Sequence, residues 1–146
     1  MCTRHLAPFA AVGILILALT VGCSAENTPV AEHVASAAAS SWLKEVDRDS
    51  LNTAYREAGD ILQERHPKSE WIANVREVRT RMGDVVNRRP DARRYETDPV
   101  RHPEGAYVIV TFRTDFTNQQ DVEEMLVMRL NEGVWQPERY IIDPLP

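Results

Sequence analysis

The sequence predicts an α+β domain, with three N-terminal helices packed on one face of a four-stranded antiparallel sheet in a cone-like arrangement, preceded by a signal peptide. Up to Gly83, apolar residues recur with the spacing of amphipathic helices, and after Gly83 they recur at every second position, as in strands. Helices followed by an antiparallel meander are typical of α+β domains. Without the leader and a linker, about 115 residues remain, enough for one compact domain but not two.

Residues 1–22 predict a lipoprotein signal peptide. Arg4 is the single Lys or Arg among them, no acid is present, and an apolar stretch runs from Leu6 to Leu19. The string Leu19-Thr20-Val21-Gly22-Cys23 looks like a bacterial lipobox, in which a small residue precedes a cysteine that is diacylated and becomes the new N-terminus. We therefore expect cleavage between Gly22 and Cys23 and lipidation of Cys23.

Two other interpretations of the leader stay open. The uncharged span Leu6–Ala25 is just long enough to cross a bilayer as a permanent helix, although Pro8 and Gly13 interrupt it. The signal could also be cleaved without lipid. The second cysteine, Cys2, lies in the leader, so a lipidated chain would contain neither a free thiol nor a disulfide.

Three helices are predicted after a tether at residues 23–29, in a single domain that covers 30–146. The first begins at Val30, where apolar residues recur every fourth position to Val46. The second covers residues 51–64 and ends before His66-Pro67. The third covers residues 69–82, and Gly83 is a natural C-terminal stop.

Four strands are predicted after Gly83. The first begins at Val85 and is disturbed by Pro90, and the second, residues 108–116, has the clearest alternation. The third, residues 122–130, places Glu124 on one face with apolar neighbours. A turn at residues 131–133, in which Gly133 can take positive φ, connects it to the fourth strand, residues 134–143.

Several segments together resemble the bacterial exported family known as domain of unknown function 4019, over roughly residues 40–142. The segments that carry the resemblance are Ser41-Trp42-Leu43-Lys44-Glu45-Val46-Asp47, Trp71, Val78-Arg79, Met82-Gly83, Glu104-Gly105-Ala106-Tyr107-Val108-Ile109-Val110-Thr111-Phe112, Thr114-Asp115-Phe116, Glu123-Glu124, Gly133-Val134-Trp135 and Arg139-Tyr140-Ile141-Ile142. The resemblance implies a layout similar to the ketosteroid isomerase and nuclear transport factor superfamily. That superfamily contains both enzymes and binding modules, so the fold does not select a function.

The charge of the chain argues against nucleic-acid binding. The chain without residues 1–22 has a net charge of −6, because only Arg4 of the 17 Lys and Arg residues, and none of the 22 acids, lies in the leader. A local excess of positive charge lies between Arg76 and Arg101, where eight arginines face five acids. These arginines could contact anionic headgroups or cell-wall carboxylates. They could equally pair with the acids of a twisted, solvated strand.

No catalytic or metal motif is apparent. His33, His66 and His102 are too far apart in sequence for a zinc motif, and no Gly-rich phosphate loop or nucleophile turn is present. We therefore expect no metal, no cofactor and no assigned catalytic residue.

An enzyme of the cone-shaped superfamily would need a carboxylate tuned by an apolar pocket and a donor for the developing oxyanion. By residue type, the bases would come from Asp47, Asp115 and Glu124, and the donors from Tyr55, Tyr107 and Tyr140. Arg113 and Asp115 share one strand face, where a surface ion pair is equally natural.

The three tryptophans divide by position. Trp42 and Trp71 lie on helix stripes and are expected in the core, whereas Trp135 follows a turn and is expected at a rim. The candidate ligand or interface residues are Trp135, Tyr107, Arg113 and Asp115.

The sequence thus favours a lipid-anchored protein of the cell envelope that binds a partner or small molecule without catalysis. Ser24 after the cysteine favours the outer membrane, facing the periplasm, over the inner membrane. An isomerase- or hydratase-type enzyme is the alternative. A homodimer through the sheet face is a further expectation, and Tyr107, Ile109, Met125 and Val127 would form it.

Overall fold

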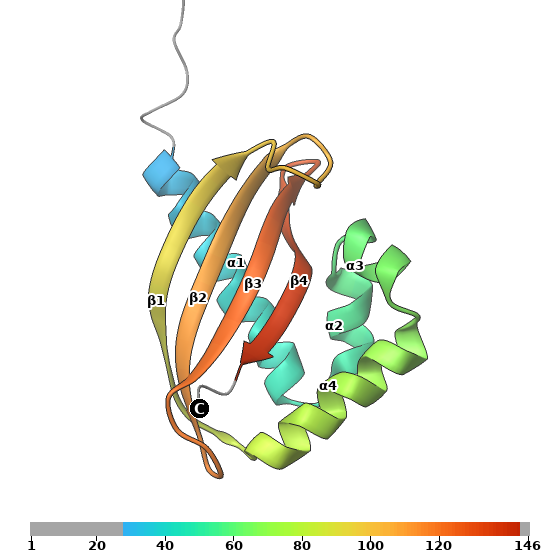
Figure 1. The fold of residues 1–146 in the computed structure, drawn as a ribbon, viewed down its shortest axis with the longest axis vertical. Helices are drawn as coiled ribbons and strands as arrows, with labels where there is room; N and C mark the ends of the chain where they lie inside the picture. The colour runs from blue at the N-terminus through green and yellow to red at the C-terminus, as the bar shows by residue number, and fades with distance from the viewer. Residues whose placement is uncertain (1–27, 144–146) are drawn as a thin grey trace, which may run out of the picture.

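The computed structural model describes residues 28–143. The predicted signal peptide, Gly22 and Cys23 lie outside the described residues. Within residues 28–143, no helix is both long and apolar enough to cross a membrane. The described chain is α+β, with all helices before a four-stranded antiparallel sheet, as the sequence predicted (Figure 1).

The sheet is a meander in chain order. Its strands are β1 (Val85–Thr97), β2 (Ala106–Phe116), β3 (Val122–Asn131) and β4 (Val134–Asp143). In the β3–β4 turn, Glu132 and Gly133 have φ of 48° and 84°, the positive values that a two-residue hairpin turn needs. Pro90 lies at a register irregularity in the edge strand β1, a position where proline is tolerated.

The two faces of the sheet differ as the alternation predicted. The inner face, toward the helices, carries Val108, Val110, Phe112, Leu126 and Met128, all buried. On the outer face the residues between them in sequence are half-buried, and the apolar ones are Ile109, Met125 and Val127.

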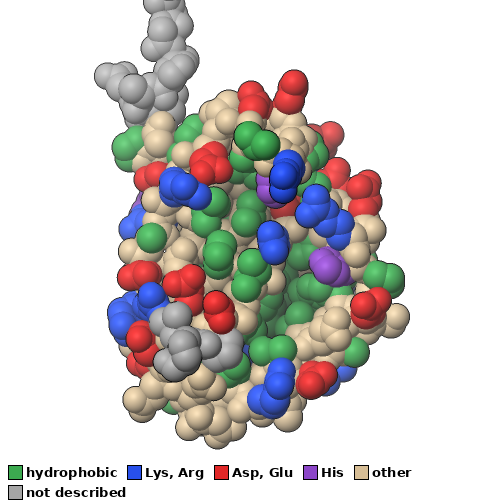
Figure 2. Space-filling model, viewed as in Figure 1, with side chains coloured by type: hydrophobic (Ala, Val, Ile, Leu, Met, Phe, Trp, Pro, Cys, Tyr) green, Lys and Arg blue, Asp and Glu red, His purple; other side chains and the backbone are tan. Residues whose placement is uncertain are grey.

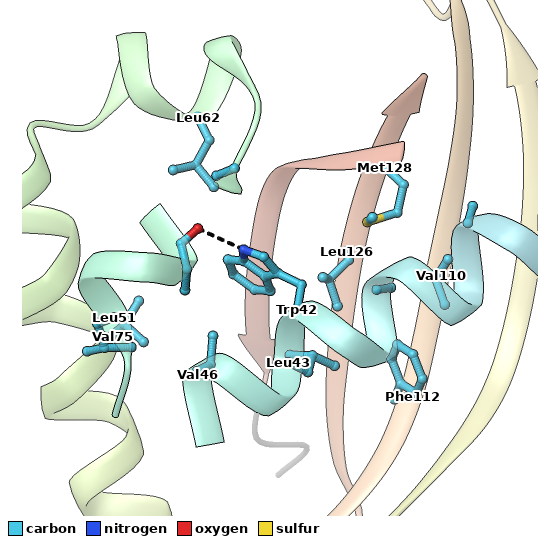
Figure 3. Close-up of a cluster of buried hydrophobic side chains, with 14 of the residues drawn as sticks. Trp42, Leu43, Val46, Leu51, Leu62, Val75, Val110, Phe112, Leu126 and Met128 are labelled. Atoms are coloured by element: carbon cyan, nitrogen blue, oxygen red, sulfur yellow. Dashed lines mark hydrogen bonds between the residues drawn. The ribbon is translucent and has the colours of Figure 1, made fainter. Parts of the chain in front are cut away.

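Helix α1 (Thr28–Asp47) crosses the inner face and contacts all four strands (Figure 1). Its central anchor is Trp42, whose indole N–H donates to the Ala54 carbonyl at 2.8 Å (Figure 3). The Trp42 ring also packs against Trp71 and, edge-on, against Tyr140, with centroid distances of 6.0 and 5.4 Å. Trp42 and Trp71 therefore belong to the core, as expected.

The expected single helix over residues 51–64 is two helices, α2 (Leu51–Glu57) and α3 (Asp60–Arg65). Ala58 and Gly59 between them are extended, and the Gly59 N–H donates to the Pro137 carbonyl at 3.0 Å. A Cβ on Gly59 would overlap the Glu138 carboxylate, so glycine allows the close approach of β4. The break is thus caused by a strand far away in sequence.

The sequence predicted that all the helices would cover one face of the sheet, but the structure differs. Only α1 lies across the sheet; α2 packs on α1 and on α4 (Lys68–Met82), and α3 packs on β4. Figure 1 shows α2, α3 and α4 beside the edge of β4. The physical reason is area: the 20-residue helix α1 covers most of the buried inner rows, and the end of α4 covers the remainder, where Met82 packs on Phe116 and Val122. The rest of α4, together with α2 and α3, extends the core sideways.

Candidate functional site

Glu124 is the most deeply buried charged residue of the described chain. It lies in the inner row of β3, between Val122 and Leu126, and is 0% exposed. One carboxylate oxygen accepts from Arg88 Nε at 2.6 Å and from the Thr114 hydroxyl at 2.5 Å. The other accepts from the Tyr140 hydroxyl at 2.6 Å. Each oxygen of this carboxylate therefore has a hydrogen-bond donor.

Asp47, the last residue of α1, completes an ionic cluster with Glu124. Its carboxylate accepts from both Nη atoms of Arg88, at 2.7 and 2.9 Å, and from Arg79 at 2.6 Å. Arg79 also lies 3.5 Å from Glu124, and its guanidinium stacks 4.7 Å from the Phe116 ring centroid. We call Asp47, Arg79, Arg88 and Glu124 the ionic cluster; its two cations balance its two anions.

The contacts of the ionic cluster change the pKa of Arg88 and of the neighbouring Tyr140. Burial alone would lower the pKa of the Arg88 guanidinium, but its hydrogen bonds to Asp47 and the charge of Glu124 outweigh burial and raise it. Burial, and then the negative charge of Glu124, raises the pKa of Tyr140 well above its usual value of 10.0. Tyr140 therefore stays a neutral donor, and the cluster offers no free carboxylate for proton abstraction.

An apolar cleft of about 330 Å³ lies beside this cluster, between β4 and α4. Tyr140 connects the two, because it lines the cleft and its hydroxyl donates to Glu124. Figure 2 shows hydrophobic side chains on the floor of the hollow between the sheet and the helices. The other lining residues are Leu62, His66, Trp71, Asn74, Val75, Val78, Arg139, Ile141 and Ile142.

The rim of the cleft carries basic and polar groups over that apolar floor. Arg139 is exposed on β4, and His66 follows α3. Within residues 28–143, the guanidinium of Arg139 has no ion pair or side-chain hydrogen bond. This pattern, an apolar floor with a few polar groups at the edge, is typical of small-molecule sites.

A second buried carboxylate, Glu138, has different partners. It is 4% exposed and accepts from the Ile61 N–H at 3.0 Å and from the Asn131 amide at 3.1 Å. The guanidinium of Arg129 is 3.9 Å away and also pairs with Asp60. Burial raises the pKa of Glu138 above its usual 4.5, although the Asn131 hydrogen bond opposes this. Glu138 holds the start of α3 against β4.

The structure does not bring the four predicted interface residues together. Tyr107 is completely buried, because its hydroxyl donates to the Pro103 carbonyl at 2.9 Å and its ring packs against His102. Trp135 is half-buried against the core on the inner side, beside Ala38 and Trp42. Trp135 thus has the partly exposed position that the sequence indicated, but Tyr107 is not a surface residue.

Arg113 and Asp115 do lie on one face, the outer one, and both have local partners. Arg113 pairs with Glu123 at 3.3 Å and with Asp91 at 3.5 Å. Asp115 accepts from the Asp121 N–H at 3.0 Å and so holds the β2–β3 turn. These contacts stabilise the strands and their turn.

Sequence reasoning selected six residues by type, and the structure brings three of them together: Asp47 and Glu124 lie in the ionic cluster, and the Tyr140 hydroxyl donates to Glu124. The other three, Asp115, Tyr55 and Tyr107, have partners elsewhere. Sequence reasoning missed Arg79, Arg88 and Thr114 as partners of Asp47 and Glu124. One signal was available: Glu124 occupies a row that is otherwise apolar, and a buried carboxylate requires cations or donors nearby. Which arginines supply them depends on how α1, α4 and β1 meet.

Among residues 28–143, no group of three or more His, Cys, Asp or Glu side chains could hold a metal ion. A family model described as a protein of unknown function (DUF4019) matches residues 38–140. The chain belongs to the DUF4019 family. The match includes every residue of the ionic cluster and every residue that lines the cleft except Ile141 and Ile142. No curated protein and no solved structure matches the chain.

Proposed function

We propose that this DUF4019 protein is a lipid-anchored cell-envelope protein that binds a small amphipathic ligand without catalysis. The lipobox-like string ending at Cys23 supports the anchor. Ser24 supports the outer membrane, on the periplasmic side, as its location. The domain would bind through the cleft between β4 and α4.

The observation that carries the binding proposal is the contrast between Glu124 and the cleft beside it. An enzyme that moves protons needs a carboxylate or histidine facing its substrate. Glu124 is not among the residues that line the cleft, and its carboxylate is occupied by two arginines, a threonine and Tyr140. The residues that line the cleft include no carboxylate, and their one histidine, His66, is exposed at the rim above an apolar floor. We therefore favour binding over an isomerase or hydratase activity.

The rim indicates the chemistry of the ligand. Arg139 would pair with an anionic group, and Trp71, Val75 and Ile142 would contact an apolar body. A short-chain carboxylate or a similar amphipathic anion combines both features. The apolar part would contribute in proportion to the area it buries.

A thermal-shift series tests this proposal. The chain from Ser24 to Pro146, which contains every described residue, is titrated with alkanoates of increasing chain length. At one hundred times its dissociation constant a ligand adds about 2.7 kcal/mol of stability. We expect stabilisation that increases with chain length until the cleft is full.

Two variants and one matched control localise the effect. Arg139→Gln removes the rim cation, and Val78→Phe fills the cleft, so both should abolish the shift. Arg94 lies in the same cross-strand row as Arg139, to which it is connected through Ile109 and Val127, but it is on β1, the opposite edge strand. Arg94→Gln should therefore leave the thermal shift intact. Equal loss in all three variants would show that the alkanoates bind elsewhere.

The anchor has its own test. Cys23→Ser should release the protein from the membrane fraction, because acylation needs the thiol. If the variant stays in the membrane, the leader is a permanent transmembrane helix.

The outer face of the sheet favours a second interaction, a homodimer. Its two central rows contain Ile109, Met125, Val127 and Ile141, all half-buried within one protomer. Arg113 and Glu123 border these rows. Sedimentation of the Ser24–Pro146 chain would show a dimer that Val127→Glu dissociates; a monomer at all concentrations would contradict it.

A further inference from the structure

Exposed large hydrophobic side chains are concentrated at one end of the molecule. The described residues contain six of them: Val30, Val34, Val86, Val100, Leu130 and Val134. Val86 lies at the start of β1, and the other five lie at the opposite end of the domain. Single exposed apolar residues are ordinary on protein surfaces, but a concentration of them marks a contact site.

The sheet register places the loops at this end together. The pair Thr97–Ala106 closes β1 and β2 below the loop that holds Val100, which is 87% exposed. The pair Leu130–Trp135 closes β3 and β4 beside Val134, which is 60% exposed. Since neighbouring strands are antiparallel, the β1–β2 and β3–β4 loops both project from the same end of the sheet (Figure 1).

The start of α1 lies at this same end. Glu32 accepts a hydrogen bond from the Tyr95 backbone N–H at 3.0 Å, near the end of β1. Burial along α1 begins only at Ala35, so Val30 and Val34 extend beyond the packed part of the helix, 61% and 47% exposed. We call Val30, Val34, Val100, Leu130 and Val134 the apolar end.

The lipidation site is close to the apolar end along the chain. Thr28, the first residue of α1, follows Cys23 by five residues. Fully extended, these residues span at most about 18 Å. If Cys23 is acylated, as the proposed function requires, the end of the domain that carries α1's first turn cannot move far from the bilayer surface.

We propose that the apolar end rests on the phospholipid bilayer and orients the domain. The five side chains would insert among the lipid headgroups, so that the sheet stands on the membrane with the β2–β3 turn pointing away. The inference rests on the lipid anchor but not on the ligand proposed for the cleft.

The charges of this end indicate an apolar contact rather than an electrostatic one. Arg93, Arg94 and Arg101 lie there, but so do Glu96, Asp98, Glu104 and Glu132. Anionic lipids therefore gain little from this surface, and its attachment should be nearly independent of salt.

Site-directed labelling of the full lipidated chain tests the proposal. The processed chain would have no free thiol, because Cys2 leaves with the leader and the sulfur of Cys23 carries the lipid, so an introduced cysteine is a unique labelling site. Val100→Cys and Val134→Cys carry a polarity-sensitive fluorophore, and Val86→Cys is the matched control at the opposite end. The protein is reconstituted in vesicles of phosphatidylethanolamine and phosphatidylglycerol that contain spin-labelled lipid.

Labels at Val100 and Val134 should shift to the blue and lose emission by quenching from the lipid, with and without added salt. The label at Val86 should do neither. Equal quenching at all three positions, or none at Val100 and Val134, would overturn the proposal. A blue shift without quenching would also overturn it, because the contact would then be with protein, such as a second copy.

The outcome is separable from the other tests. If Cys23→Ser releases the protein but the labels at Val100 and Val134 are not quenched, the anchor is real and the orientation is wrong. If alkanoates fail to bind while those labels are quenched, only the cleft proposal fails.

Discussion

Glu124 and Glu138 are both buried carboxylates on neighbouring strands, yet they are held in opposite ways. Glu124 contacts two guanidinium groups and two hydroxyls, and belongs to a cluster with balanced charge. Glu138 is held mainly by backbone and amide N–H groups, and its pKa is raised. Burial alone does not decide the role of a carboxylate; the charge of its partners does.

The two carboxylates therefore have different structural roles. The ionic cluster joins α1, α4 and the edge strand β1 to Glu124 of β3. Glu138 joins one short helix to one strand. Loss of the first should affect the whole domain, and loss of the second should affect the region around α3.

The largest effect is expected for Glu124→Gln. The substitution leaves Arg79 and Arg88 in the interior with one anion instead of two, and breaking a buried ion pair costs about 3–5 kcal/mol. Urea unfolding would measure the change. Glu123→Gln, next in sequence but on the half-exposed outer face, should cost under about 1 kcal/mol. Equal losses would mean that the cluster does not hold the elements together.

An intermediate effect is expected for Gly59→Ala. The backbone of Gly59 has φ of −72°, which alanine adopts easily, so the cost comes only from overlap with Glu138. Overpacking of this kind costs about 1–3 kcal/mol. In a Glu138→Ala background the same substitution should cost much less. A cost that stays the same in both backgrounds would contradict the close contact as its cause.

The smallest effect is a pH dependence due to Glu138. Its folded pKa lies above the unfolded value, so its contribution to stability is complete below pH 4.5 and is lost as pH rises through the folded pKa. The stability of the wild type relative to Glu138→Gln should therefore fall as pH rises from 4.5, and then level off. Thermal unfolding of both chains from pH 4 to pH 8 measures this. A difference that grows in favour of the wild type would mean that the carboxylate is stabilised in its charged form.

The strands were predictable from sequence because their information is local. Period-two alternation from Val108 to Phe116 fixes which side chains face the helices, and Gly133 fixes the hairpin. The row that contains Glu124 was also predictable. Its inward direction follows from Leu126 and Met128 alone.

What was not predictable depends on distant contacts. The helix is interrupted at Gly59 because β4 approaches it there, and the sequence of residues 51–64 does not indicate where Glu138 lies. The ionic cluster likewise needs α4 and β1 to meet the end of α1. The exposure of Val30 and Val34 reflects where the sheet ends, although their spacing alone is that of a buried stripe.

The position of α1 also has a consequence for how the domain reaches its final structure. Helix α1, the first helix of the described residues, packs on all four strands, and its Trp42 contacts Tyr140 of the last strand. Contacts between such distant parts of a chain form late and slowly, because the intervening loop must close first. The core therefore cannot be completed until β4 has emerged. Under the export that we propose, such a chain would cross the membrane unfolded, and its arrival on the far side, rather than its synthesis, would set the moment of folding.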